Sequence, residues 1–215
     1  MLLNSMIHRT IALFAIATGM LFMPFAQAQA QNDGRYQTLQ TIQPSETAGK
    51  IEVLEFFAYT CPHCKAMEPL VESWSETLLG DVTLNRVPIA FNANMAGLQK
   101  LYYTLENMER LDLHRAVFNA IHNERKSLFT DAEIIDWAAE QGLDRQIFTD
   151  IFKSFGIQSR VSRANELAKN YNIESTPIIA IGGRYVTSPG MTNSYEATIQ
   201  EADKLIEKAR EQGQP

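Results

Sequence analysis

The sequence predicts an α/β fold: a central mixed sheet flanked by helices, with an inserted all-helical domain. Three observations carry this prediction. Residues 51–59 form a nearly continuous apolar run of strand length, typical of a strand buried on both faces, and helical spacing follows it. Roughly 70 residues, 94–163, then show helical periodicity without a convincing strand. A strand, a pair of glycines and a second strand follow at 178–186.

The chain begins with a predicted signal peptide, residues 1–28. Arg9 precedes a mostly apolar run, 11–25, and two small-x-small sites end at Ala28 and Ala30, so cleavage is expected after one of these. The apolar run is too short to favour spanning a bilayer. We therefore expect export to an oxidising compartment, where disulfides form and persist. An uncleaved anchor is the alternative, and N-terminal sequencing of the exported protein distinguishes the two.

The charge of the chain excludes one class of partner. The formal net charge is −6, and removing Arg9 with the signal peptide takes it to −7. Nucleic-acid binding depends on clustered Lys and Arg side chains, and no long basic run offsets this acidic balance. The length remaining after cleavage suits one domain with a substantial core, or a core with an insertion.

Residues 31–93 are expected to form the first part of the sheet domain. Residues 37–42 alternate weakly and predict a short edge strand, which precedes the long apolar strand. A helix is predicted to begin at Pro62, because apolar residues then recur at helical spacing. The alternating stretch 82–91 predicts a second strand, parallel to the first because a helix connects them.

Residues 94–164 are expected to form the helical insertion, and residues 165–215 the second part of the sheet domain. Inside the insertion, Thr130 and Glu133 make a capping box that opens a helix, and Gly156 is expected to stop another. The later elements are a helix at 158–171, a hairpin turning at Gly182-Gly183, a loop at 188–190 and a closing helix at 193–210.

The only two cysteines of the chain lie in the motif Cys61-Pro62-His63-Cys64. A disulfide closing so small a loop stabilises a fold by only about 2 kcal/mol, which disfavours an inert structural role. We expect Cys61 at the N-terminal edge of the helix and Pro62 at its first position. The positive end of the helix macrodipole then lowers the pKa of Cys61, and His63 adds a nearby donor. Stabilising the thiolate makes the disulfide a stronger oxidant, so the motif favours donating a disulfide.

A metal or haem site is the competing interpretation of this motif. A structural zinc site needs four ligands. Covalent haem requires a histidine directly after the second cysteine, and Lys65 stands there. The soft ligands outside the signal peptide are Cys61, Cys64, His63, His114 and His122. We therefore expect no metal, and no cofactor beyond the redox-active cysteine pair itself.

Four further residues are candidates for a role near the motif. Glu55 lies inside the apolar strand, and burial would raise its pKa and suit it to exchange a proton with Cys64; a solvated carboxylate is the alternative. Glu68 and Arg86 are interpreted as surface charges rather than as a network beneath the motif. Pro177 opens an apolar strand and, on these residues alone, is interpreted as a strand boundary.

Three segments resemble the DsbA family of periplasmic thiol:disulfide interchange proteins, in the thioredoxin superfamily. They are 56–64, FFAYTCPHC; Thr176-Pro177 before the Gly-Gly hairpin; and Pro189-Gly190-Met191. The resemblance covers nearly the whole mature chain, and the Pro-His dipeptide between the cysteines is quite specific. It implies a thioredoxin-like fold with a helical insertion, a periplasmic location, and a monomer that is not embedded in the membrane.

The resemblance also implies a mechanism. A substrate thiolate attacks the exposed sulfur of Cys61 to give a mixed disulfide. A second substrate thiolate resolves it, leaving Cys61 and the buried Cys64 reduced. A quinone-linked inner-membrane protein of DsbB type is then expected to reoxidise the pair.

The resemblance reverses the interpretation of Pro177. Thr176-Pro177 is expected to be a cis-proline loop facing the motif, where the backbone of Thr176 pairs with an extended substrate segment. Pro189 and Met191 are expected to bind substrate as well. The best-known members carry valine before this proline, so the Thr176 hydroxyl is expected to alter the redox potential and the resolution of mixed disulfides.

We therefore predict an oxidoreductase that donates its Cys61–Cys64 disulfide to newly exported proteins with free thiols. Two alternatives stay open: a disulfide isomerase or reductase on the same fold, and a peptide-binding periplasmic chaperone whose cysteines are incidental. Insulin-reduction and scrambled-disulfide assays separate the first alternative from the oxidase. A double Cys61→Ala, Cys64→Ala variant tests the second.

Overall fold

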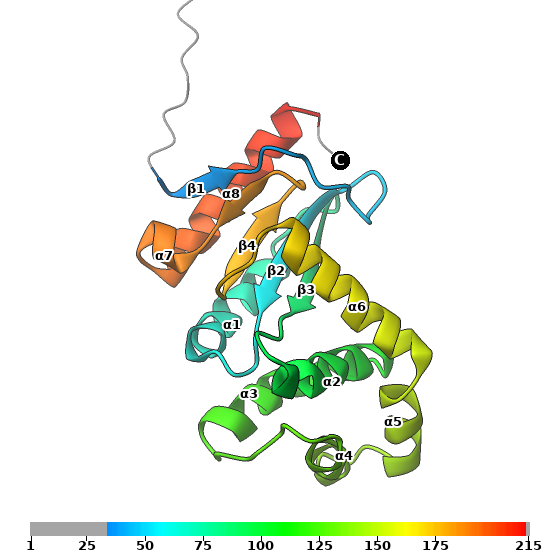
Figure 1. Cartoon of the computed structure of the whole chain (residues 1–215). Coiled ribbons are helices and arrows are strands. Elements are labelled where there is room, and N and C mark those ends of the chain that lie inside the picture. Colours follow the sequence, from blue (N-terminus) through cyan, green and yellow to red (C-terminus); the bar gives the residue numbers. More distant parts are fainter. Residues whose placement is uncertain (1–33, 214–215) are drawn as a thin grey trace, which may run out of the picture. The chain divides into compact units, whose positions relative to one another are not determined.

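The computed structural model describes residues 34–213, and five strands there form one mixed sheet in the order β1-β5-β4-β2-β3 (Figure 1). The strands are β1 Tyr36–Thr38, β2 Ile51–Phe57, β3 Val82–Pro88, β4 Ile178–Ile181 and β5 Tyr185–Thr187. β2 runs parallel to β3 and antiparallel to β4. The predicted fold class is confirmed, whereas the predicted signal peptide and its cleavage sites lie outside the described residues.

Helices pack against the sheet and form the insertion between its two parts. They are α1 Pro62–Ser75, α2 Ala96–Asn107, α3 His114–His122, α4 Asp131–Glu140, α5 Arg145–Phe152, α6 Phe155–Asn170, α7 Pro189–Thr192 and α8 Tyr195–Glu211. Short 3₁₀ turns precede α2 and α3, at Ala93–Met95 and Leu111–Leu113. Figure 1 shows α2 to α5 beyond the end of the sheet where β2 stops, with α6 leading back toward it. None of the helices described in 34–213 has the length and apolar character to cross a membrane.

β2 is a central strand, and all seven of its residues are buried. Two hydrophobic clusters meet on it. Ile51 and Val53 belong to the cluster that includes residues of α1 and α8, and Leu54 and Phe56 belong to the cluster that includes residues of α6. The second cluster continues into α2, α3, α4 and α5. The helical insertion therefore shares its core with the sheet, and burial of this common apolar surface fixes one against the other.

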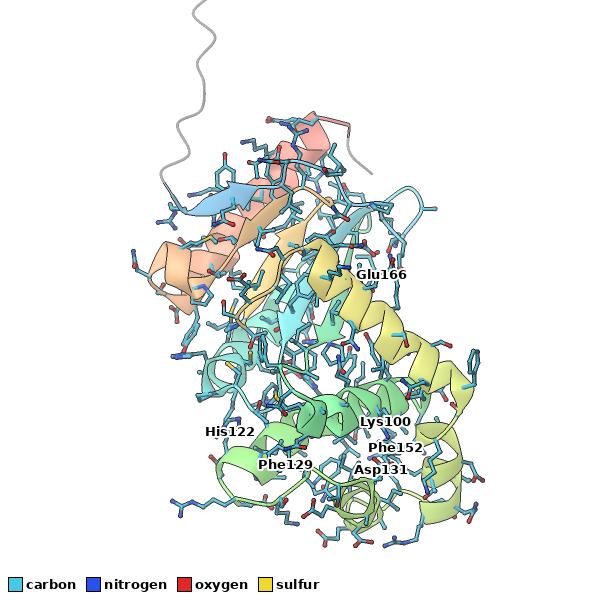
Figure 2. All side chains as sticks on the ribbon, in the orientation of Figure 1. Lys100, His122, Phe129, Asp131, Phe152 and Glu166 are labelled. Atoms are coloured by element: carbon cyan, nitrogen blue, oxygen red, sulfur yellow. The ribbon has the colours of Figure 1, made fainter. Side chains whose placement is uncertain are left out.

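Polar contacts also join helices within the insertion (Figure 2). The Nζ of Lys100 in α2 lies 3.0 Å from a carboxylate oxygen of Asp131 in α4 and 4.5 Å from the ring centre of Phe152 in α5. The predicted capping box of Thr130 and Glu133 is present at the start of α4. These contacts satisfy the first turn of α4 and link three helices.

The β4–β5 hairpin turns at two glycines, as predicted. Gly182 and Gly183 have φ angles of 57° and 64°, a region that glycine enters at little cost. A Cβ on Gly183 would lie 2.1 Å from the carbonyl oxygen of Gln43, so the neighbouring chain leaves no room for a side chain. The loop holds three residues, Gly182 to Arg184, because the strand pairing closes at Ile181 with Tyr185.

Several boundaries of the sheet part differ from the prediction, and one of them is the end of the strand predicted at 82–91, which is β3 and stops at Pro88. The edge strand is Tyr36–Thr38 rather than 37–42, because only these three residues pair with β5; the Tyr36 ring also packs edge-to-face on Tyr185. Residues 188–190 were predicted as a loop, but only Ser188 precedes the single-turn helix α7, and Pro189 and Gly190 lie inside it. Ser188 is extended there, and the proline that follows occupies the start of the helix, where its missing N–H costs nothing.

The prediction of a helix stop at Gly156 is wrong. α5 already ends at Phe152, and the hydroxyl of Ser154 accepts a hydrogen bond from the backbone N–H of Ile157, which caps α6. Gly156 therefore lies in the first turn of α6, where the cap offsets the cost of a glycine. The predicted domain boundary after residue 164 falls inside this helix.

Candidate active site

The motif Cys61-Pro62-His63-Cys64 lies between the end of β2 and the first turn of α1. The backbone N–H of Cys61 donates to the carbonyl oxygen of Ala58 at 3.0 Å, which closes a turn after the strand. Cys61 is the extended N-cap residue, and Pro62 stands at the first position of α1, as predicted. The free N–H groups of the helix start are therefore available to the Cys61 sulfur.

Cys61 is the partly exposed cysteine, and its thiol readily ionises. Its pKa falls from 9.0 to about 5. The largest cause is a hydrogen bond from the thiol of Cys64, and the backbone N–H of Cys64, the Thr176 side chain and the backbone N–H of His63 act in the same direction against partial burial. The Cys61 Sγ also lies 3.3 Å from the carbonyl oxygen of Thr176. A thiolate at Cys61 is thus stable near neutral pH.

Cys64 has the opposite environment. Its side chain is only 1% exposed, and burial, followed by the hydrogen bond to Cys61, raises its pKa well above 9.0. Both cysteines are free thiols. A reagent in solvent therefore reaches Cys61, while Cys64 keeps its proton.

Within the described part of the chain, no three His, Cys, Asp or Glu side chains gather as a metal site requires.

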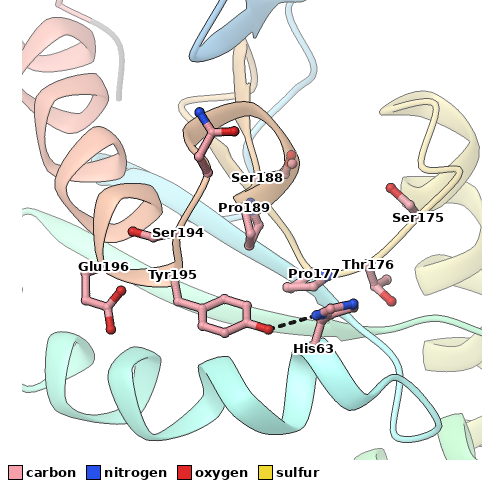
Figure 3. A pocket seen from close by; sticks show the side chains of 11 residues that line it. His63, Ser175, Thr176, Pro177, Ser188, Pro189, Ser194, Tyr195 and Glu196 are labelled. Carbon is pink, nitrogen blue, oxygen red and sulfur yellow. Dashed lines mark hydrogen bonds between the residues drawn. The ribbon is translucent and has the colours of Figure 1, made fainter.

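The Thr176–Pro177 peptide bond is cis, as the family resemblance implies. The carbonyl oxygen of Thr176 faces the sulfur of Cys61. A pocket of about 600 Å³ lies beside this loop (Figure 3). Residues from α1, the cis-proline loop, α7 and the start of α8 line it. Pro189 is among the lining residues and Met191 is not, so one of the two predicted groove residues faces this pocket.

His63 also lines this pocket. Its Nδ1 lies 2.8 Å from the hydroxyl of Tyr195, the first residue of α8 (Figure 3). The contribution of His63 to the low pKa of Cys61 comes from its backbone N–H. The imidazole is thus bound to α8, and its predicted action on the thiolate through the ring stays a prediction. Tyr195 belongs to no motif, and the sequence did not single it out.

Glu55 is buried, with 1% of its surface exposed, which agrees with the favoured interpretation. Burial, followed by the charge of Glu68, raises its pKa to about 8, and Arg86 opposes this shift. The Arg86 Nε lies 3.1 Å from a Glu55 carboxylate oxygen, but the two are not aligned as a hydrogen bond. Among residues 34–213, no hydrogen bond joins Glu55 to Cys64, so direct proton exchange between them stays a prediction.

The interpretation of Glu68 and Arg86 as surface charges is wrong. Glu68 is 3% exposed and accepts a hydrogen bond from Arg86 at 2.8 Å. Arg86 stands opposite Glu55 in the β2–β3 register, so its guanidinium reaches both carboxylates. Glu68 lies one helical turn beyond Cys64 on the buried face of α1, which turns its side chain inward. A charged network therefore lies beneath the motif.

Two further residues, not predicted for the site, join this network. The Tyr59 hydroxyl and the His114 Nδ1 lie 2.7 Å apart, and the His114 Nε2 lies 3.2 Å from a Glu68 carboxylate oxygen. His114 shares the buried face of α3 with Val117 and Phe118. Its i, i+3, i+4 spacing with these residues is the sequence signal that marks it as buried.

Comparisons with known proteins agree with this geometry. A thioredoxin model matches residues 40–102, and the model of the DSBA-like thioredoxin domain matches residues 79–201. A thiol:disulfide interchange protein DsbA of Bordetella parapertussis is 51% identical over 203 residues, which cover 94% of this chain and 96% of the relative. The chain belongs to the DsbA family. A DsbA of Pseudomonas aeruginosa is 39% identical over 197 residues, 91% of this chain and 93% of the relative.

Solved structures of DsbA proteins share the fold. The crystal structure of Pseudomonas aeruginosa DsbA has a TM-score of 0.81 and 38% identity, covering 85% of this chain and 95% of that one. The oxidoreductase NmDsbA1 from Neisseria meningitidis has a TM-score of 0.77 and 26% identity, covering 88% and 98%. As a member of the DsbA family, the chain is a thiol:disulfide oxidoreductase that catalyses disulfide formation.

Proposed function

We propose that the chain oxidises newly exported proteins by donating the Cys61–Cys64 disulfide to pairs of client thiols. The opposite environments of the two sulfurs carry this proposal: Cys61 is accessible with a pKa of about 5, and Cys64 is buried with a raised pKa. Stabilising the Cys61 thiolate stabilises the reduced protein. A pair whose reduced form is stabilised gives up its disulfide readily, which is the property of an oxidant.

The exchange proceeds in two balanced steps. A client thiolate attacks the Sγ of Cys61, the bond to Cys64 breaks, and the Cys64 sulfur leaves and takes up a proton. A second client thiolate then attacks the client sulfur of the mixed disulfide and expels Cys61 as a thiolate. The client gains one disulfide and the cysteine pair gains two electrons. Sulfur chemistry alone carries both steps, so the proposed reaction uses no metal and no other cofactor.

The client segment is proposed to lie along the cis-proline loop. The carbonyl oxygen of Thr176 is 3.3 Å from the Cys61 sulfur, so a peptide that pairs with this backbone brings its own cysteine to Cys61. Pro177 and Pro189 give the adjoining pocket apolar surface for a neighbouring client side chain. Pairing through backbone groups supports broad specificity, because every client offers them.

The proposed place of the reaction is the periplasm, where the chain acts as a monomer. This follows the predicted signal peptide and the family resemblance. Each turnover leaves Cys61 and Cys64 reduced, so a partner must remove two electrons before the next one. We propose a quinone-linked inner-membrane protein of DsbB type for that step.

The test is the oxidation of a reduced model peptide that carries two cysteines. The purified oxidised protein is expected to convert the peptide to its disulfide with one equivalent of protein consumed, and a Cys61→Ala variant is expected to convert none. Inactive wild-type protein, or an active Cys61→Ala variant, contradicts the proposal. Faster insulin reduction than peptide oxidation supports a reductase instead. An undiminished effect of the double-alanine variant on client folding supports a chaperone.

A further inference from the structure

His114 is a buried, titratable side chain that the proposed exchange does not use. It belongs to α3 of the helical insertion, yet it lies against the thioredoxin-like part of the fold. Its surface is 4% exposed, and its ring packs edge-on at 5.0 Å from Phe57 and 5.2 Å from Phe118. Both ring nitrogens meet polar groups: Nδ1 is 2.7 Å from the Tyr59 hydroxyl and Nε2 is 3.2 Å from Glu68.

The Glu68 carboxylate favours a proton on Nε2, because the other neutral tautomer would turn a lone pair toward its negative charge. When the Tyr59 hydroxyl donates to Nδ1, the neutral ring carries its proton on Nε2, facing Glu68. When the ring is charged, Nε2 carries a proton as well. Both arrangements therefore place an N–H dipole or a full positive charge beside the Glu68 carboxylate. The contact is not aligned as a hydrogen bond, so its effect is electrostatic.

Glu68 connects His114 to the cysteine pair. It lies on α1 seven residues after Cys61, which is about 10 Å along the helix axis. The Glu68 carboxylate is buried, so solvent screens its charge less than that of a surface group, and this charge opposes a thiolate at the start of the same helix. Glu68 also acts on its nearer neighbour Glu55, whose pKa it raises. How fully Glu68 is neutralised therefore bears on the energy of the reduced motif.

Two groups lie against the Glu68 carboxylate, and they come from different parts of the fold. Arg86 donates to it at 2.8 Å from β3, and His114 meets its other oxygen from the insertion. A cavity of about 230 Å³ reaches this cluster. The titratable groups that face His114 or share this cavity are Tyr59, Glu68, Glu72, Arg86, Tyr102, Asp112 and Arg115.

We propose that His114 is a positioning residue through which the helical insertion sets the equilibrium between the disulfide and dithiol forms of Cys61 and Cys64. It acts by compensating the negative charge of Glu68 beneath the motif. Without it, the uncompensated carboxylate disfavours the Cys61 thiolate, and the pair becomes a weaker oxidant. The proposal rests on the redox role of the cysteine pair and adds a second part of the chain to it.

The experiment measures the equilibrium constant of the cysteine pair with glutathione in full-length mature protein and in His114 variants. His114→Leu is expected to shift the equilibrium toward the disulfide form by about threefold to tenfold, and to raise the midpoint at which the Cys61 thiolate absorbance appears. His114→Gln keeps a donor near the Nε2 position and should restore most of the wild-type value. His114→Asn keeps a polar group only near Tyr59. Its equilibrium should therefore shift toward the disulfide form as far as that of His114→Leu.

Gln99→Leu is the matched control. Gln99 is a buried polar residue of the insertion, and it binds the carbonyl oxygen of Pro88 and the side chain of Asn165 rather than the network. Its variant should lose stability without moving the glutathione equilibrium. If His114→Leu behaves in the same way, His114 is only a packing residue and the proposal fails.

The amide variants decide the question if the leucine variant does not fold. An asparagine variant with the wild-type equilibrium, or a glutamine variant shifted as far as the asparagine variant, overturns the proposal. A strongly reducing value for the wild-type protein contradicts the proposed oxidase function instead. The ratio between variant and wild type tests His114 separately, so the two failures are distinguishable.

Discussion

Two groups of residues around the cysteine pair, here called the rim and the floor, differ in whether they stabilise a negative charge. The rim consists of Cys61, His63, Thr176 and Tyr195. The floor consists of Glu55, Glu68, Arg86 and His114. At the rim, hydrogen-bond donors outweigh partial burial and lower the pKa of Cys61 to about 5. At the floor, burial and a neighbouring carboxylate outweigh one arginine and raise the pKa of Glu55 to about 8.

The difference shows that burial and hydrogen-bond donors compete in deciding whether an acid in this site ionises: donors prevail at Cys61, and burial prevails at Glu55. Cys61 and Glu68 lie on the same helix, two turns apart, so the macrodipole favours an anion only at the first. Glu55 has a cation at 3.1 Å but no aligned hydrogen bond from it. Burial therefore outweighs the attraction of this cation, and the raised pKa leaves the Glu55 carboxyl mostly protonated at neutral pH.

The largest effect is expected from replacing Cys64, which removes the disulfide and the main donor to Cys61 together. Cys64→Ala and Cys64→Ser should both lose peptide oxidation completely, because neither can hold a Cys61–Cys64 disulfide. The thiol of Cys64 is the largest cause of the low pKa of Cys61, so alanine should raise that pKa by at least about one unit. Serine, which keeps an O–H donor, should raise it less. Titration of the thiolate absorbance measures both, and equal midpoints would contradict this account of the rim.

The second effect is the pH dependence of the rim. Alkylation of Cys61 in the reduced protein should be flat above its pKa of about 5 and fall about tenfold per pH unit below it. Because folding lowers this pKa from 9.0, the reduced protein gains stability as pH rises from about 5 to 9.0, and loses that stability as pH falls through about 5. The oxidised protein lacks this contribution. Thermal unfolding midpoints of the reduced and oxidised proteins, measured from about pH 5 to 9.0, test this prediction. If the two midpoints changed with pH in parallel, the low pKa of Cys61 would not contribute to stability.

The third effect separates the floor from the rim. The pKa of Glu55 rises from 4.5 to about 8 on folding, so the wild-type protein loses stability as pH increases across that interval. Glu55→Gln should abolish this loss and be more stable than the wild type above about pH 8, by about 1.4 kcal/mol for each unit by which folding raises the Glu55 pKa, a shift that already includes the attraction to Arg86. Denaturant unfolding at several pH values measures it.

Glu52→Gln is the matched control for that measurement. Glu52 is another buried acid of β2, bound to Thr47 and Asn85, and its replacement leaves Glu55 in place. This variant should therefore keep the wild-type loss of stability with pH. A Glu55→Gln protein with the same loss would show that the loss has another source.

The rim was more predictable from sequence than the floor, because local rules determine it. The Cys-Pro pair at a helix start and the buried strand before it follow from short-range patterns, and both are confirmed. The cis peptide before Pro177 did not follow from such rules and required the family resemblance. Tyr195 meets His63 only because α8 begins beside α1 in the folded chain.

The floor depends on contacts between distant segments. Arg86 is inward-facing because β3 pairs in parallel with β2 at Glu55, a register that spacing alone does not supply. Glu68 belongs to a helix with other polar residues, so its burial is set by the sheet and α3 that cover it. His114 comes from the insertion, and its partners Tyr59 and Glu68 are in the other part of the fold. Charged residues are mostly exposed, and this general rule produced the wrong interpretation here.

The smallest effect is expected at Thr176, the residue of the rim that precedes the cis-proline. The Thr176 side chain lowers the pKa of both cysteines, although it is not the largest cause for either. Thr176→Val removes the hydroxyl and keeps the carbonyl that meets the Cys61 sulfur. It should therefore shift the glutathione equilibrium toward the disulfide form by about twofold to fivefold, within the range of one hydrogen bond. Thr176→Ser retains the hydroxyl and should match the wild type. A valine variant that is a stronger oxidant than the wild type would show that the hydroxyl stabilises the disulfide form rather than the thiolate.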